Sequence, residues 1–336
     1  MTAARDPQDL KARLNRWIAS RAELGEARVE SLVAATGGAS SETWLLELAD
    51  RQPGWVLRIE PRGRQIYEDP SVARQFAVIR ALMADPALPV PAALALEEDE
   101  TAIGAPFFMM ERASGEAPPN AYHTQGLIAA ASSQERSAMA RSSLALLARL
   151  HALDPAPFAF LGWPGGDAIA QELGRWDSYR AWAGLPPIAL FDRARAWLEE
   201  HRPAPQPPGF AWGDARPANI LFAGARPSAL LDWETASLGG AESDLGWWLF
   251  YDRMITEEEG VPPLPGWPDA AETLRLWEAA SGRAALAMDW HLAFAGYRFA
   301  LISERARALA IAAGLIPETA RGFANPAVRL LSKLLD

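Results

Sequence analysis

The sequence predicts an α+β protein of two lobes. The small lobe has an antiparallel five-stranded sheet with one main helix, and the large, mostly helical lobe contains one β-hairpin. The chain has 336 residues, which is longer than one average domain. Its first third alternates short apolar strand-like runs with turns. The remainder is rich in long alanine- and leucine-rich helical segments, interrupted by a short β segment at 210–233.

The small lobe is predicted over residues 1–112. It comprises, in order, a helix at 8–24, strands at 28–33, 42–48 and 55–59, a helix at about 71–84, and strands at 92–97 and 106–112. The second helix follows Asp69-Pro70, in which aspartate is a good N-cap and proline suits the first helical position. Three strands, one helix and two further strands form the order found in the small lobe of protein-kinase-like folds.

The large lobe is predicted over residues 113–336. A Gly- and Pro-containing segment at 114–120 is expected to link the lobes. Long helices are expected at 134–151 and 284–310, where alanine and leucine dominate. A proline-rich stretch at 261–268 is predicted to be a loop that is long enough to form a lid.

Composition narrows the classes of function. The chain has no cysteine, which excludes disulfides, thiolate nucleophiles and cysteine-ligated metals. Its four histidines are scattered, so a metal would bind carboxylate and amide oxygens, as Mg²⁺ does. The net charge of −10 argues against a nucleic-acid partner. No apolar run approaches the roughly 20 residues that span a bilayer. We therefore expect a cytoplasmic monomer or homodimer without a membrane partner.

The segment 210–234 carries the most informative side chains. Two short apolar runs separated by a Gly/Pro turn indicate a β-hairpin. A turn centred between residues 225 and 226 would place Asn219 opposite Asp232, with Asp214 on the loop that enters the hairpin. Two oxygen ligands for a hard cation, with a carboxylate to orient a hydroxyl, are what metal-assisted phosphoryl transfer requires. A surface hairpin with ordinary turn-forming residues is the alternative.

The stretches WGDARPANILF and LLDWETASLGGAESDLGWWL resemble the aminoglycoside-phosphotransferase family of small-molecule kinases. The family pattern reads H-G-D-x-x-x-x-N, then D-W/F-E, then D-L. The resemblance covers about residues 32–302 and is nearest to the bacterial subgroup associated with acyl-CoA dehydrogenases. It implies ATP as phosphate donor, Asp214 as catalytic base or hydroxyl-orienting group, and Asn219 and Asp232 as Mg²⁺ ligands. Asp244 is expected to tie down the loop that follows the metal site.

The resemblance also indicates a nucleotide site in the small lobe. The small-residue loop at 34–43 would cover the phosphates with backbone N–H groups. Its expected contacts are Gly37, Gly38, Ala39, Ser40 and Ser41. Residues 107–112 would form the hinge that hydrogen-bonds the adenine, with contacts at Met110 and Glu111. A plain hairpin turn and a buried strand are the alternatives for these two segments.

Arg58 is the candidate phosphate anchor. Strand alternation in 55–59 puts it on the face opposite three large apolar side chains. There it would replace the lysine that kinases usually hold on this strand. The only lysines of the chain, Lys11 and Lys333, lie near its termini. An exposed strand arginine is the alternative.

Two positions depart from the family pattern, and both are assigned to structural support. Gln75 stands where a glutamate would pair with the phosphate-binding lysine, so Glu42 or Glu68 could supply the missing charge. Trp212 stands where the catalytic loop usually has histidine, which puts the geometry of that loop in question. His151, at the end of a long helix, is also expected to be structural.

The acceptor is expected near Asp214 in the large lobe. Candidate contacts are Trp247, Trp248, Tyr251 and Arg298. Such aromatic residues favour an apolar or acyl-bearing acceptor. The large lobe has 25 acidic and 19 basic residues, which is not the dense acidity that a polycationic aminoglycoside would need. We expect phosphorylation of a small-molecule hydroxyl, with a hydroxyacyl compound preferred to an aminoglycoside. A nucleotide-binding pseudokinase is the alternative, and the preference for ATP over GTP stays open.

Overall fold

The computed structural model describes residues 5–35, 42–49, 51–63, 65–162, 166–318 and 325–336. The predicted phosphate-covering residues Gly37, Gly38, Ala39, Ser40 and Ser41 lie outside the described residues. The chain divides into two compact units, Met1–Ser114 and Gly115–Asp336. This division lies two residues beyond the predicted lobe boundary.

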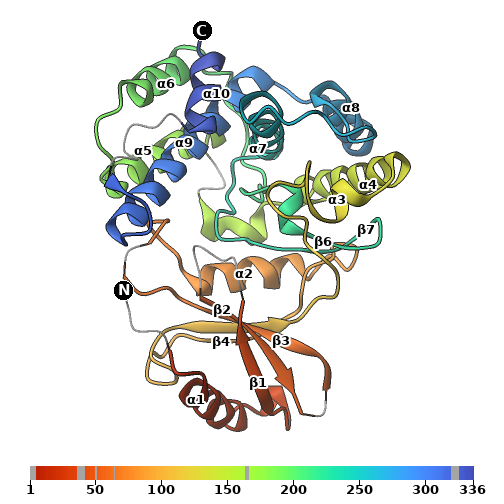
Figure 1. The fold of residues 1–336 in the computed structure, drawn as a ribbon, viewed down its shortest axis with the longest axis vertical. Coiled ribbons are helices and arrows are strands. Elements are labelled where there is room, and N and C mark those ends of the chain that lie inside the picture. The colour runs from red at the N-terminus through yellow and green to blue at the C-terminus, as the bar shows by residue number, and fades with distance from the viewer. Residues whose placement is uncertain (1–4, 36–41, 50, 64, 163–165, 319–324) are drawn as a thin grey trace. The chain divides into compact units, whose positions relative to one another are not determined.

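The first unit is built on a five-stranded antiparallel sheet (Figure 1), in the order β1-β2-β3-β5-β4. The strands are β1 (Val29–Ala34), β2 (Glu42–Leu48), β3 (Arg51–Ile59), β4 (Ala93–Glu97) and β5 (Phe107–Glu111). Number, order and antiparallel pairing agree with the small lobe predicted from the sequence. β5 lies inside the sheet between β3 and β4.

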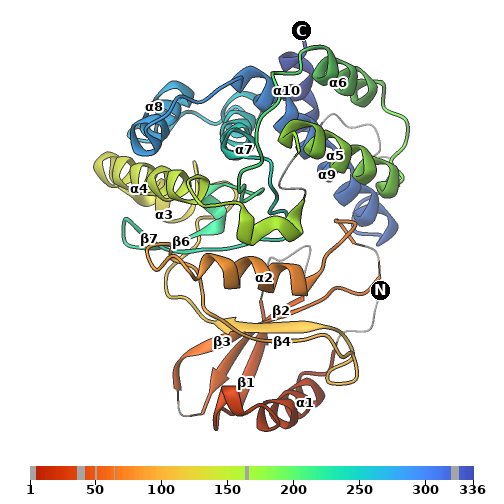
Figure 2. The same cartoon turned by 180° about the vertical axis from the view of Figure 1, so that it is seen from behind.

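Two helices cover opposite faces of this sheet (Figure 2). Asp6 caps the N-terminus of α1 (Pro7–Ala19), because its carboxylate accepts a hydrogen bond from Gln8 N. Ser71 caps α2 (Val72–Leu82) in the same way, with its hydroxyl accepting from Arg74 N. The apolar stripe of α1 joins β3 in one core cluster through Leu10, Leu14, Trp17, Ile18, Trp55, Leu57 and Ile59. The predicted first helix is too long, since it ends at Ala19 and a 3₁₀ turn follows at Ala22–Leu24.

The second unit is mostly helical and contains the predicted hairpin. Its helices are α3 (Gly126–Ala130), α4 (Ser133–His151), α5 (Ala168–Ala183), α6 (Ala189–Glu200), α7 (Ala241–Arg253), α8 (Ala270–Ser281), α9 (Met288–Ala312) and α10 (Pro326–Leu334). Its two strands are β6 (Ile220–Ala223) and β7 (Arg226–Leu230), and 3₁₀ turns lie at Ala156–Leu161 and Pro217–Asn219. None of the helices in the described part of the chain has the length and apolarity to cross a membrane.

α7 forms the centre of the second unit, because every residue from Ala241 to Tyr251 is buried. α9 packs along it closely enough that a Cβ at Gly246 would lie 2.4 Å from the carbonyl oxygen of His291. Any larger residue at this position would therefore separate the two helices. α7 also leads directly into a π-helical turn, Met254–Glu258, which precedes the proline-rich stretch predicted to be a loop at 261–268.

The π-helical turn is held by α10 rather than left as an open loop. Glu258 accepts from Arg329 Nε at 2.9 Å and from Lys333 Nζ at 2.6 Å. Burial opposes ionisation of Glu258, but Lys333 and Arg329 hold the pKa of its carboxyl below the usual value. Of the three consecutive glutamates at 257–259, Glu258 is thus a structural carboxylate, with a side chain that is 3% exposed.

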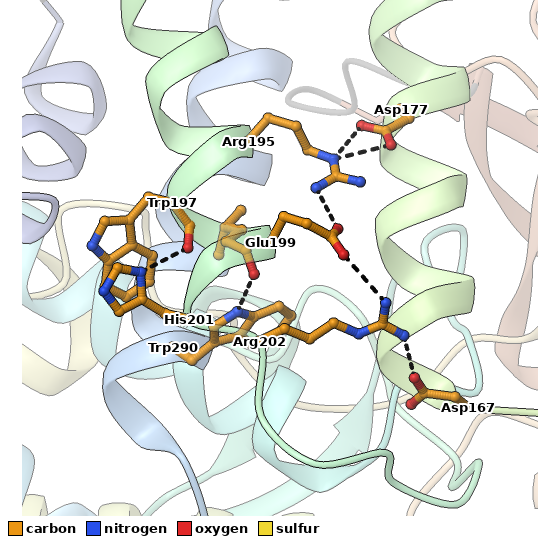
Figure 3. Close-up of polar contacts among 9 residues, drawn as sticks. Asp167, Asp177, Arg195, Trp197, Glu199, His201, Arg202 and Trp290 are labelled. Carbon is orange, nitrogen blue, oxygen red and sulfur yellow. Dashed lines mark hydrogen bonds and ion pairs between the residues drawn. The ribbon is translucent and has the colours of Figure 1, made fainter.

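A chain of ionic contacts joins α5 to α6 (Figure 3). Arg195 binds Asp177 of α5 at 2.9 Å and Glu199, one turn along α6, at 2.9 Å. Arg202 continues the chain from Glu199 to Asp167, the N-cap of α5. Partly exposed ion pairs of this kind each contribute little to stability. This series of ion pairs therefore serves mainly to orient the two helices.

Because of the buried His291, we expect the folded protein to lose stability in acid. Neither of its ring nitrogens has a hydrogen-bond partner among the described residues, and it is 2% exposed. Burial lowers its pKa to about 4, with Glu242 opposing and Arg298 reinforcing the effect. The unfolded chain therefore binds the proton first, and stability that is complete above about pH 6.5 is lost as the pH falls toward 4.

Through His291, lowering the pH from 7.5 to 5 should reduce the free energy of unfolding by about 2 kcal/mol. We expect His291→Leu to remove that part of the pH dependence of unfolding measured in urea. His201→Gln, which changes an exposed histidine, serves as the control. An unchanged pH dependence in His291→Leu would contradict the prediction.

Candidate active site

The hairpin that carries the candidate site has a different register from the predicted one. Ile220 pairs with Leu230, and the tight turn includes Gly224 at φ 62°. The turn thus lies one residue earlier than predicted, because glycine takes the left-handed conformation there. Leu231 N donates to Asn219 O at 2.9 Å, so Asn219 stands opposite Leu231, and the predicted pairing with Asp232 was wrong by one residue.

Asp232 follows β7 in an uncommon backbone conformation. Its φ of 65° lies in the left-handed region, which costs a residue other than glycine about 1–2 kcal/mol and is tolerated best by aspartate and asparagine. Such outliers gather at functional sites, where the surrounding structure holds them. Trp233, which follows Asp232, packs against Trp212 with ring centroids 5.4 Å apart, and this packing holds the backbone directly after Asp232.

Asp214 is the most tightly held side chain of the site. Its Oδ2 accepts from Asn219 Nδ2 at 2.7 Å, and its Oδ1 accepts from Trp247 Nε1 at 2.7 Å. Arg216 Nε lies across both oxygens, 2.9 Å from Oδ1 and 3.1 Å from Oδ2. The carboxylate is therefore oriented by donors from the loop that precedes β6 and from α7.

Asn219 is oriented by the same contacts. Its Nδ2 donates both to the carboxylate and to the backbone carbonyl of Asp214, at 2.7 and 2.9 Å. Both amide hydrogens are thus directed at Asp214, and this assigns the amide orientation. Its Oδ1 points away from Asp214 and keeps acceptor capacity suited to a hard cation.

Arg216 is a site residue that the sequence analysis missed. Its Nη1 donates to Asn120 Oδ1 at 2.9 Å, and its guanidinium lies 5.1 Å from the ring centroid of Tyr251. Burial disfavours the charged form, but the carboxylates of Asp214 and Asp232 and the neighbouring Tyr251 raise the pKa of Arg216 above its usual value. Its position two residues after Asp214 was the sequence feature that could have identified Arg216 as a site residue.

Asp244 supports the loop before Asp214, not the loop after the metal site as predicted. It is fully buried and accepts from the backbone N–H groups of Trp212 and Gly213, both at 2.7 Å. His151 Nε2 contacts it at 3.0 Å, and Trp277 Nε1 donates to His151 Nδ1 at 3.1 Å. The bond from Trp277 places the His151 proton on Nε2, so His151 donates to Asp244 in a structural role.

Trp212 stabilises the loop before Asp214, at the position where the resembled family usually has histidine. It is 1% exposed, and its Nε1 donates to Leu231 O at 2.8 Å. The tryptophan therefore connects the catalytic loop to the segment that leads into Asp232. Together with Asp244, it fixes the geometry that the absent histidine had put in question.

Two of the predicted substrate contacts are core residues. Trp248 is 2% exposed and stacks on Trp267, with centroids 6.4 Å apart. Arg298 is 2% exposed and donates to Ser243 Oγ at 2.8 Å and to Gly213 O at 2.9 Å. Both side chains are thus packed in the core of the second unit, Trp248 on α7 and Arg298 on α9, which composition could not reveal.

The other two predicted substrate contacts are also buried, but they lie at the site. Trp247 binds the Asp214 carboxylate, as described above. The Tyr251 hydroxyl donates to Asn120 O at 3.2 Å, and its ring lies under the Arg216 guanidinium. Both residues therefore contact site side chains and offer little exposed surface of their own.

An apolar cavity of about 520 Å³ lies close to these residues in the second unit. Its wall includes Met254, Phe299, Ala306, Ile316, Glu259 and Arg307. The Phe299 ring packs on Trp247 with centroids 5.2 Å apart, and Trp247 in turn binds Asp214. Phe299 is thus the one side chain that separates this cavity from the indole bound to the Asp214 carboxylate.

In the first unit, Arg58 lies on the α2 face of β3, as alternation predicted. Its Nη2 donates to Gln75 Oε1 at 3.2 Å. Glu42 is engaged by Arg5 at 2.9 Å, and Glu68 is exposed. Of the three candidates for pairing with Arg58, the structure therefore favours Gln75.

The predicted adenine contacts, Met110 and Glu111, lie in β5. Met110 pairs with Val56 on one side and with Ala93 on the other, because β5 is an interior strand. Glu111 N donates to Ala92 O at 2.9 Å. The backbone N–H of Glu111 is thus used by the sheet, and the hinge contacts at these two residues stay a prediction.

Comparison with known proteins identifies the family. Residues 31–284 match the phosphotransferase enzyme family, APH. The chain is 31% identical over 214 residues to acyl-CoA dehydrogenase family member 10 of Mus musculus, covering 62% of this chain and 19% of that protein. The curated relatives it matches are longer proteins, of which it spans between 19% and 39%.

Solved structures share the fold. A Ralstonia eutropha JMP134 protein assigned as an aminoglycoside phosphotransferase matches with a TM-score of 0.71 at 23% identity, over 96% of this chain and 95% of that chain. A complex of APH(2'')-IIa with streptomycin and ATP matches with a TM-score of 0.60 at 15% identity, over 98% and 97%. These structures confirm the predicted fold class, and the match over residues 31–284 confirms the predicted family.

Proposed function

Because the chain belongs to the phosphotransferase enzyme family, we propose that it transfers the γ-phosphate of ATP to a hydroxyl group of a small molecule. The observation that carries the proposal is the Asp214 carboxylate, held through both oxygens by Asn219, Arg216 and Trp247. Phosphoryl transfer relies mainly on positioning and electrostatics, which a fixed carboxylate supplies. The ATP complex of the similarly folded APH(2'')-IIa supports ATP as the donor.

In the proposed reaction, Asp214 accepts a hydrogen bond from the acceptor hydroxyl and orients its oxygen in line with the γ-phosphate. The new O–P bond forms as the bond between the γ-phosphorus and the bridging oxygen breaks, and ADP leaves. The hydroxyl proton passes late to Asp214, because the transition state is loose and needs little basicity early.

Asn219 and Asp232 fit a magnesium site through their chemistry. The amide orientation of Asn219 keeps Oδ1 as an acceptor, and the carboxylate of Asp232 is near enough to Arg216 to raise its pKa. Oxygen ligands of this kind, completed by water and phosphate, are those that Mg²⁺ prefers. Bound there, the ion would offset the negative charge of the nucleotide phosphates.

For the acceptor we propose a hydroxyacyl compound in preference to an aminoglycoside. The cavity near Trp247 is mainly apolar and has a guanidinium, Arg307, as well as a carboxylate, Glu259, in its wall. Such a lining suits an apolar chain better than a polycation. The similarity to acyl-CoA dehydrogenase family member 10 supports the same choice.

The test is a phosphotransfer screen with Mg-ATP, in which ADP release is coupled to a visible signal and products are identified by mass spectrometry. The panel contains short hydroxy acids, their thioesters, and aminoglycosides. Transfer to a hydroxyacyl compound would support the proposal, and transfer only to aminoglycosides would overturn its acceptor class. Nucleotide binding without transfer to any compound would favour the pseudokinase.

Arg58→Ala should raise the KM for ATP about 10–100-fold with little effect on the KM for the acceptor. A hydrogen bond to a charged group is worth about 1.5–3 kcal/mol, which corresponds to that range. Arg58→Lys should recover part of the loss, because a point charge serves a phosphate without the bidentate fork. Arg62→Ala, in the same unit and paired with Glu100 at 3.1 Å, is the control. Unchanged ATP kinetics in Arg58→Ala would leave Arg58 as a structural strand residue.

A further inference from the structure

Trp247 holds one side of the catalytic carboxylate with a neutral donor. Its indole Nε1–H reaches Asp214 Oδ1 at 2.7 Å, and the residue is 4% exposed. The χ2 torsion of an aspartate is broad, so one donor on one oxygen does not fix the carboxylate plane. Asn219 on Oδ2 and Trp247 on Oδ1 restrain it from two separate elements, the loop before β6 and α7.

The indole is itself prevented from turning. The guanidinium of Arg298 lies 4.7 Å from its ring centroid, and Phe299 packs against it at 5.2 Å. Arg298 also donates to Gly213 O at 2.9 Å, directly before Asp214 in the chain. The side chain that orients the carboxylate and the backbone that carries it are therefore fixed by the same arginine of α9.

α7 presents two groups to this loop from one face. Asp244 and Trp247 are three residues apart and so lie on the same side of the helix. Asp244 accepts from the backbone N–H groups at 212 and 213, and Trp247 donates to the carboxylate at 214. The backbone of this loop and the side chain of Asp214 are thus both held in place by a single buried helix, α7.

From these contacts we infer that Trp247 is a positioning residue that sets the orientation of the Asp214 carboxylate toward the acceptor hydroxyl. The inference rests on the proposed phosphotransfer. Arg216 also contacts both oxygens, but it brings a charge and is oriented by Asn120. The neutral indole restrains the carboxylate without competing for its charge, which stays available to the hydroxyl.

Trp247→Phe tests the inference, because it keeps an aromatic ring in the site and removes the N–H donor. Trp290→Phe is a matched control: Trp290 is also 4% exposed, and its Nε1 donates at 2.9 Å to Leu198 O, away from the site. We expect kcat to fall about 10–100-fold in Trp247→Phe, with the KM for ATP within about twofold of wild type. Trp290→Phe should keep kcat within about twofold. These ranges follow from one hydrogen bond to a charged group.

A second readout does not depend on turnover. In ¹⁵N-labelled protein, the indole resonance that disappears in Trp247→Phe is that of Trp247 Nε1–H. This resonance should move upfield in Asp214→Asn, because a neutral amide is a weaker acceptor than a carboxylate. The resonance that disappears in Trp290→Phe should stay in place in Asp214→Asn.

The outcomes separate this inference from the proposed function. A wild type that transfers phosphate, with equal kcat in Trp247→Phe and Trp290→Phe, would overturn the positioning role and leave the function intact. A wild type that transfers phosphate to no hydroxyl compound would overturn the proposed function, and the positioning role with it. In that case a shift of the Trp247 resonance in Asp214→Asn would establish only the hydrogen bond.

Discussion

Replacing Asp214 with asparagine is expected to lower turnover by about 10²–10⁴-fold, the usual worth of positioned acid–base catalysis. The substitution keeps the shape of the side chain and its contact with the Trp247 indole, but removes the negative charge. An amide cannot take the hydroxyl proton, and it orients a hydroxyl less strongly than a carboxylate does. Affinity for ATP and for the acceptor should stay nearly intact, since neither depends on the proton transfer.

The measurement is steady-state turnover with the best acceptor, together with nucleotide affinity by calorimetry. Asp177→Asn is a suitable control, because Asp177 is a half-exposed carboxylate that binds Arg195 of α6 at 2.9 Å. It should retain turnover within about twofold of wild type, as surface pairs are worth little. Equal turnover in Asp214→Asn and wild type would remove Asp214 from the chemistry.

The sequence predicted those features of the site that depend on local pattern. Alternation along 55–59 correctly put Arg58 on the face opposite the core, because a strand's side chains alternate whatever packs on them. The order of strands and helices in the first unit also follows local periodicity. The spacing of Asp214 and Asn219 placed them at one site, and the structure joins them at 2.7 Å.

The errors arise where one residue or distant packing decides the outcome. A left-handed glycine, Gly224, moved the hairpin turn one residue earlier, which alone would shift the partner of Asn219 by two positions. A register shift between Leu221 and Phe222 restores one of them, so Asn219 stands opposite Leu231. The donor role of Trp247 depends on how α7 packs. Every residue of α7 from Ala241 to Tyr251 is buried, polar ones included, so the sequence pattern does not distinguish a core face from a cleft face.

Asp232→Asn is expected to weaken Mg-dependent nucleotide binding by about a hundredfold or more. Even residues that only orient metal ligands are worth about 10–100-fold in metal affinity, and a charged ligand should exceed them. Asparagine is the cleanest substitution here, because it accepts the left-handed conformation that Asp232 adopts at φ 65°. Asp232→Ala removes the ligand entirely but also pays the backbone cost of about 1–2 kcal/mol, so its melting temperature should fall by a few degrees.

Comparing the two variants separates metal binding from folding. Calorimetry with ATP, in Mg²⁺ and in EDTA, should show a large metal-dependent gain in wild type and almost none in either variant. Asp192→Asn, an exposed carboxylate paired with Arg180, should keep the full gain. If Asp232→Asn retained the gain while Asp232→Ala lost both the gain and thermal stability, Asp232 would serve the hairpin's backbone rather than the metal. Loss of the gain in Asp232→Asn at unchanged melting temperature would support a role of the Asp232 charge in holding the ion and the nucleotide.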